Sequence, residues 1–110
     1  SIYAFSSYFT ISGNDSGTIT ITSPYSGVEW ARNSNHNITW TYTGSIANLK
    51  IRVFTSTFSV DTYLTMSTPC DGLYTWGVPS NFPTGTDYKV EIISTNNSSI
   101  YDFSDYFSIY

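Results

Sequence analysis

Few side chains in this sequence have the types and spacing that catalysis requires. Asp102 and Asp105 form a close pair of carboxylates, which could bind Ca²⁺ or act as acid and base. A nearly identical segment elsewhere in the chain carries Ala4 and Ser7 at the matching positions, which favours solvated surface charge instead. His36, the single histidine, has no Cys or acidic residue at metal-ligand spacing. The sequence therefore predicts no enzyme, cofactor or metal site.

Asparagine side chains offer a more concrete kind of chemistry, N-linked glycosylation. Asn14, Asn37, Asn96 and Asn97 each begin an N-x-[ST] acceptor motif. With eight Asn residues in a chain that is about 31% Ser and Thr, chance would give about two or three such motifs. Four is a mild excess. We expect N-linked sugar at one or more of these positions.

Cys70 is the only cysteine of the chain. It lies beside a predicted turn and is interpreted either as a small buried apolar side chain or as half of an intermolecular disulfide with another copy. The sequence leaves both interpretations open.

Composition bounds the class of protein. A chain of 110 residues forms one domain with a modest core. A net charge of −4 and only four basic residues exclude nucleic-acid binding, and no apolar run approaches the ~18 residues of a membrane span. The Ser/Thr-rich, aromatic-rich, weakly charged profile is typical of a secreted, extracellular or cell-surface β domain. Because the first residue is Ser1 and no signal peptide is visible, we expect a mature portion or an excerpt of a longer precursor.

Alternation of apolar and polar residues with a period of two runs through most of the chain. We expect strands at residues 18–22, 36–42, 48–54, within 58–66, and at 73–78, 87–93 and 100–109. Turn residues separate them about every ten positions, which predicts an all-β, immunoglobulin-like antiparallel β-sandwich of about seven strands. The side chains expected to be buried are Ile38, Trp40, Ile51, Val53, Trp76, Val90 and Phe107.

Tyrosines have two expected roles. Tyr88 begins the penultimate strand just after a loop, as in the tyrosine corner of immunoglobulin-like sandwiches, so we expect a structural role. Five others are candidates for exposure, where their rings could stack on sugars: Tyr25, Tyr42, Tyr63, Tyr101 and Tyr106.

Several motifs occur together in a recognisable order. PYSGVEW begins at Pro24, GLYTWGVPS at Gly72, DYKV at Asp87 and SDYFSI at Ser104. From about residue 20 to residue 109 the chain resembles the Ser/Thr-rich GPI-anchored fungal wall protein domain, which also begins the yeast β-1,6-glucan assembly proteins. Asn33 stands where that family usually has Gly, and Asn tolerates a left-handed turn. The resemblance implies a surface or wall module and carries over no catalytic residue.

The two ends of the chain are nearly the same. Residues 1–11 (SIYAFSSYFTI) and 99–109 (SIYDFSDYFSI) agree at eight of eleven positions, 98 residues apart. We expect residues 99–109 to supply the final strand of a sandwich spanning 18–110. Residues 1–11 would then be the final strand of a preceding repeat or a donated strand, with 12–17 as the linker. Its apolar residues Phe5, Phe9 and Ile11 match Phe103, Phe107 and Ile109.

Three arrangements explain this duplication: a tandem array with period 98, a head-to-tail filament built by strand exchange, or both copies in one domain on opposite sheets. The first two predict neighbouring copies of the same repeat as partners, and a structural, glycosylated module of an extracellular fibre or cell-surface stalk. The alternative is a carbohydrate-binding or cell-wall glucan-assembly surface module, with a polysaccharide as its partner.

Overall fold

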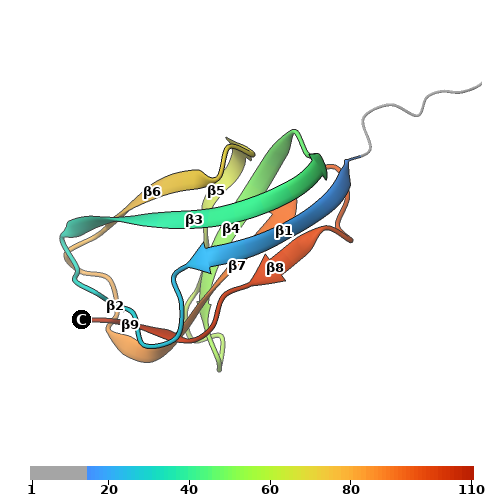
Figure 1. Ribbon diagram of the computed structural model, residues 1–110. Coiled ribbons are helices and arrows are strands. Elements are labelled where there is room, and N and C mark those ends of the chain that lie inside the picture. Colours follow the sequence, from blue (N-terminus) through green and yellow to red (C-terminus); the bar gives the residue numbers. More distant parts are fainter. Residues whose placement is uncertain (1–14) are drawn as a thin grey trace, which may run out of the picture.

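Alternating apolar residues bury one side of each of two β-sheets, which pack face to face (Figure 1). The computed structural model describes residues 15–110. Its strands are β1 (Ser16–Ser23), β2 (Glu29–Trp30), β3 (Ser34–Ser45), β4 (Asn48–Thr55), β5 (Asp61–Pro69), β6 (Leu73–Val78), β7 (Gly85–Ser94), β8 (Tyr101–Phe103) and β9 (Phe107–Ile109).

The smaller sheet has the order β1-β3-β6, and the larger has the order β2-β9-β7-β4-β5 with β8 also paired to β7. All pairs are antiparallel except β2 with β9, which run parallel. The expected all-β immunoglobulin-like sandwich is therefore confirmed. Among residues 15–110, no helix has the length and apolar character needed to cross a bilayer.

The predicted core is also confirmed. All seven expected side chains are at most 6% exposed. They extend over both sheets, because Ile38 and Trp40 belong to β3, Trp76 to β6, and the remaining four to the larger sheet. Each such side chain contributes about 1.5–3 kcal/mol by leaving water, so the alternation seen in the sequence is the main reason for the fold.

Two local expectations agree with the structure. Tyr88 is fully buried and its hydroxyl donates a hydrogen bond of 2.6 Å to the carbonyl oxygen of Pro83, so the tyrosine corner is present. Asn33 has φ of 61°, the left-handed conformation expected where the family usually has Gly.

The last expected strand is in fact two short strands. Ser104 separates β8 from β9, and its backbone N–H donates to the Val90 carbonyl while its hydroxyl accepts from the Val90 N–H. The side chain thus replaces a backbone partner and lets the chain shift register against β7. The two-residue strand β2 was not predicted, because its pairing with β9 depends on residues about 80 positions away.

The chain enters and leaves the sandwich at opposite ends (Figure 1). At the entry, the buried Asp15 carboxylate accepts hydrogen bonds from the Ala47 N–H and the Ser94 hydroxyl. Gly17 and Gly44 face each other just beyond, and a Cβ on either would collide with the opposite backbone. Strand β1 begins at Ser16, so the last two residues of segment 12–17, which was expected to be a linker, belong to the sandwich.

Candidate functional site

Two of the three groups considered for catalysis have structural partners. Asp102 Oδ2 accepts a hydrogen bond of 2.8 Å from the Ile21 N–H, which joins β8 to β1 across the two sheets, so Asp102 is not merely surface charge. Asp105 is exposed, as expected. His36 stacks on Trp30 with ring centroids 5.0 Å apart. Within the described part of the chain, no group of three or more His, Cys, Asp or Glu side chains could hold a metal ion.

A groove of about 330 Å³ lies on the outer face of the larger sheet. We call it the aromatic groove. Strands β4, β7 and β8, the β4–β5 turn and the β8–β9 loop contribute its lining residues. These are Arg52, Phe54, Ser56, Phe58, Lys89, Phe103 and Tyr106.

Phe54 forms the floor of the aromatic groove. It points outward from β4, yet it is only 7% exposed because its neighbours cover it. The Phe58 ring stacks on it with centroids 5.5 Å apart and planes 9° from parallel, and the Phe103 ring meets it edge-on at 5.9 Å. The two covering rings remain 58% and 42% exposed, so they present flat apolar surface to solvent.

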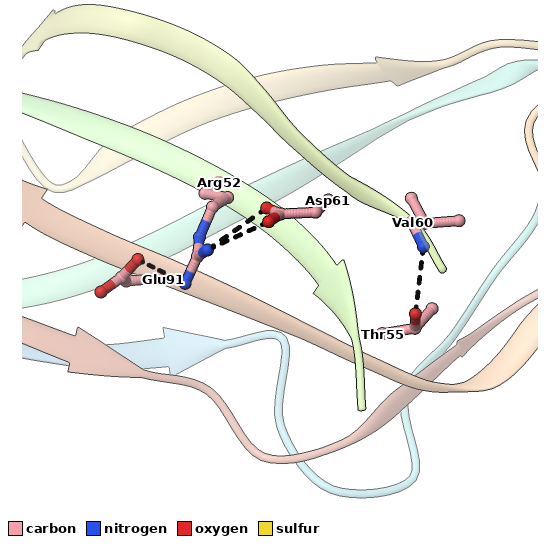
Figure 2. Close-up of polar contacts among 5 residues, drawn as sticks. All are labelled: Arg52, Thr55, Val60, Asp61 and Glu91. Atoms are coloured by element: carbon pink, nitrogen blue, oxygen red, sulfur yellow. Dashed lines mark hydrogen bonds and ion pairs between the residues drawn. The ribbon is translucent and has the colours of Figure 1, made fainter. Parts of the chain in front are cut away.

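Phe58 occupies an unusual backbone conformation, with φ of 58°. Hairpin turns of this kind normally place Gly or Asn in the left-handed position, and a bulky residue there costs on the order of 1–3 kcal/mol. The cost is offset by hydrogen bonds around the buried Thr55, whose carbonyl accepts from the Phe58 N–H at 2.9 Å. Its hydroxyl also accepts from the Val60 N–H at 3.2 Å (Figure 2). The turn thus holds an aromatic ring outward at the edge of the groove.

Arg52 lies between two carboxylates on neighbouring strands (Figure 2). Its Nη2 lies 2.9 Å from Glu91 Oε1 on β7, and its Nη1 lies 3.2 Å from Asp61 Oδ1 on β5. The guanidinium carbon is 4.5 Å from the centre of the Phe54 ring. These contacts fix the guanidinium over one end of the groove floor.

The outer face of the larger sheet carries three of the four basic residues of the chain. Lys50 and Arg52 point outward from β4, and Lys89 points outward from β7. Lys89 Nζ lies 4.6 Å from the centre of the Tyr106 ring. Among residues 15–110 only Arg52 forms ion pairs, so Lys89 brings an uncompensated positive charge to the groove of an acidic protein.

Residues 23–109 match the family model of the Kre9/KNH-like N-terminal Ig-like domain. The chain belongs to this family. No curated protein matches the chain. The matched range contains every residue that lines the aromatic groove, and the match confirms the resemblance drawn from the sequence motifs. It supports the alternative prediction, a glucan-assembly surface module, better than the main one, a fibre or stalk repeat.

The five tyrosines expected at the surface of this Kre9/KNH-like domain are all exposed, by between 45% and 62%. Only Tyr106 lines the aromatic groove. Sequence reasoning missed Phe54, Phe58 and Phe103 as site residues. The outward position of Phe54 in the alternation was an available signal, whereas nothing in the sequence marked Phe58, because its placement depends on a left-handed turn.

The four glycosylation motifs differ in accessibility. Asn37 and Asn96 are exposed. Asn97 is half-buried, and its Nδ2, the atom that would carry a glycan, donates a hydrogen bond of 3.1 Å to the Asp15 carbonyl. Asn14 lies outside the described residues.

Cys70 is half-buried and packs against the core of the Kre9/KNH-like domain. Burial raises the pKa of its thiol, the Trp40 indole acts in the opposite direction, and the charges of Asp15 and Asp71 raise the pKa further. A half-buried thiol that stays protonated is a poor nucleophile for disulfide formation.

Phe5, Phe9 and Ile11, expected to form an inter-repeat strand, lie outside the described residues. Their counterparts in residues 99–109 have two different positions. Phe107 and Ile109 are 1% exposed, whereas Phe103 covers Phe54 in the aromatic groove. Residues 99–109 therefore contribute side chains to both the core and the aromatic groove.

Proposed function

We propose that this domain is a secreted, non-catalytic cell-wall module that binds a wall glucan in the aromatic groove. Two facts support the proposal: membership of a family associated with fungal β-1,6-glucan assembly, and a groove whose lining suits a neutral sugar polymer. A secreted or wall location is what membership of that family suggests.

The chemistry of the groove fits a glucose ring. A pyranose has apolar C–H faces and a rim of hydroxyl groups, so its binding site needs flat rings beside a few hydrogen-bonding groups. Phe58 and Phe103 supply exposed rings, and both rings contact Phe54. Arg52 and Lys89 supply N–H donors along the same groove. The open shape of an outer sheet face suits a chain of sugars that extends beyond both ends of the site.

The observation that carries the proposal is the exposed Phe58 ring in a left-handed backbone. A protein that needed only a tight turn would gain stability from Gly at this position. Backbone strain that is retained around an exposed ring is common at ligand sites, where the surrounding structure enforces it.

The test is titration with linear glucan oligosaccharides, followed by the amide spectrum of the ¹⁵N-labelled domain. We expect β-1,6-linked oligosaccharides to shift the amides of residues 52–58, 89 and 103–106, and to do so more strongly than β-1,3-linked oligosaccharides. Phe58→Gly removes the ring while leaving a backbone that adopts φ of 58° without strain, so it should fold and lose at least tenfold in affinity. Tyr42→Ala is the matched control, because Tyr42 is 45% exposed but belongs to β3 of the smaller sheet.

Unchanged affinity in Phe58→Gly would rule out the aromatic groove as the glucan site. The structure has another hollow, of about 380 Å³, whose lining includes Glu29, Gly85 and Tyr110. Amide shifts confined to that hollow would also rule out the aromatic groove.

A further inference from the structure

Residues 99–109 close the sandwich of this domain. Ile100, Ser104, Phe107 and Ile109 are at most 6% exposed and fill the space beside β7. The outward side chains of the same segment, Tyr101, Phe103 and Tyr106, lie on the outer face, where the last two line the aromatic groove.

The N-terminal segment repeats every one of these side chains. Ile2, Ser6, Phe9 and Ile11 match the four buried positions, and Tyr3, Phe5 and Tyr8 match the three outward aromatic ones. The differences fall only at Asp102, Asp105 and Ser108, none of which is buried. The repetition is thus selective for the residues that build the core and the groove.

The place for such a segment in this domain is already filled. β9 lies between β2 and β7, and β8 pairs with β7 beside the edge of β1. If residues 1–11 exchanged with the closing segment of another copy, the same buried side chains would replace one another and no additional core surface would be buried. The exchange would also lose the hydrogen bond from the Ile21 N–H, because Ala4 stands in place of Asp102. An exchange therefore has no driving force.

We infer that residues 1–11 are the closing segment of a preceding copy of the same domain, 98 residues earlier in the chain, so that copies follow one another covalently. Entry and exit at opposite ends of the sandwich place such copies end to end (Figure 1). Only residues 12–14 separate the closing segment from Asp15, which is anchored by its buried carboxylate. The link from residue 11 to residue 15 spans at most about 14 Å, so adjacent copies are held close together.

The preceding copy would also carry two aromatic residues of the groove rim, since Phe5 and Tyr8 match Phe103 and Tyr106. A row of such domains presents a series of grooves to one extended polymer, and binding at several of them multiplies the affinity without new contacts. The inference about the array itself rests on the closing segment and does not depend on what the groove binds.

The test adds a copy of residues 12–98 directly before Ser1 of the full chain. Residues 1–11 then follow the added copy at the position that residues 99–109 occupy in the original domain. We expect two folded domains and a doubled set of dispersed amide signals. Phe9→Ala should lower the melting temperature of the added domain alone by roughly 15–30 °C, and Phe107→Ala that of the original domain alone. In the 110-residue chain, Phe9→Ala and deletion of residues 1–11 should each leave the melting temperature unchanged.

Three results would overturn the inference. One is rapid proteolysis of the added residues while the original domain stays intact. Another is a loss of stability in the 110-residue chain on Phe9→Ala, which would place the segment in its own domain. The third result comes from a second version of the added domain, in which A4D, S7D and T10S make the closing segment identical to residues 99–109. If this version folds and the version with the natural residues 1–11 does not, the natural segment is insufficient to close a domain. Failure of glucan binding would leave all of these outcomes unaffected.

Discussion

The Tyr88 hydroxyl donates a hydrogen bond of 2.6 Å to the carbonyl oxygen of Pro83, five residues earlier in the chain. The bond closes the loop before β7 over a fully buried ring. Tyr88→Phe keeps the ring and leaves that carbonyl without its partner. We expect the free energy of unfolding to fall by about 1–2 kcal/mol, measured by urea denaturation. Tyr110→Phe, at an exposed ring, is the control and should have no effect.

The burial of Tyr88 also leads to a prediction about alkaline pH. Burial, and secondarily the charge of Asp87, raise the pKa of Tyr88 above its ordinary value of 10.0. Because the folded pKa is higher than the unfolded one, this stabilisation is fully present below about pH 10 and is lost as the pH rises through the folded pKa. Absorbance at 295 nm should show one tyrosine that ionises only as the protein unfolds. Ionisation of every tyrosine in the still-folded protein would contradict this.

Asp102 and Asp105 should respond differently to alanine. Asp102→Ala removes the acceptor of the Ile21 N–H and should cost about 1–2 kcal/mol of unfolding free energy. Asp105→Ala changes an exposed side chain and should cost less than about 0.5 kcal/mol. Equal effects in thermal denaturation would mean that the contact between β8 and β1 is not important.

The two carboxylates around Arg52 should also differ in their contribution to the free energy of unfolding. Asp61 is 41% exposed in its ion pair, so Asp61→Ala should cost at most about 0.5 kcal/mol. Arg52→Ala leaves the 13%-exposed Glu91 carboxylate without its partner and uncovers Phe54, and we expect a loss of about 1–3 kcal/mol. The comparison is made by urea denaturation at low and at 1 M salt, and the Asp61 effect should be the more salt-sensitive of the two.

Cys70 should react slowly with thiol reagents. Burial raises the pKa of its thiol, which lowers the thiolate fraction at neutral pH, and packing against the core restricts access. We expect reaction with a coloured disulfide reagent at pH 7.5 to be at least tenfold slower in the folded protein than in urea. Fast reaction, or rapid formation of a covalent dimer in air, would support the intermolecular disulfide instead.

Glycosylation should separate the two adjacent motifs at residues 96 and 97. Secretion from a eukaryotic cell, followed by glycopeptide mapping, should find sugar on the exposed Asn37 and Asn96. Asn97 should remain free because its Nδ2 is hydrogen-bonded to Asp15. Replacing Asn96 with Gln should not transfer the sugar to Asn97; such a transfer would show that the contact opens readily.

Local regularities of the sequence predicted the fold well. Alternation placed Ile51, Val53 and Val90 in the core, and the position of Tyr88 after a loop identified the corner. Both features depend on residues close together in the chain. The short parallel strand β2 could not be predicted, since no pattern in two residues indicates a partner some 80 positions away.

The candidate site could be predicted only in part, for the same reason. The five surface tyrosines were identified from composition and alternation, but the groove is built where the β4–β5 turn, β8 and the β8–β9 loop meet. Phe103 was not recognised as a groove residue, because the sequence did not show that Ser104 divides the last strand in two. The roles of Asp15 and Asp102 depend on hydrogen bonds that span about 80 residues, which no local motif reveals.

Entry and exit at opposite ends also determine how the domain would respond to being stretched. Tension applied between Ser16 and Tyr110 runs along β1 and β9, whose backbone hydrogen bonds lie perpendicular to the strands. Such a force shears the whole β1–β3 ladder at once and cannot open it one bond at a time. In single-molecule pulling we therefore expect abrupt unfolding at high force and not a gradual extension at low force.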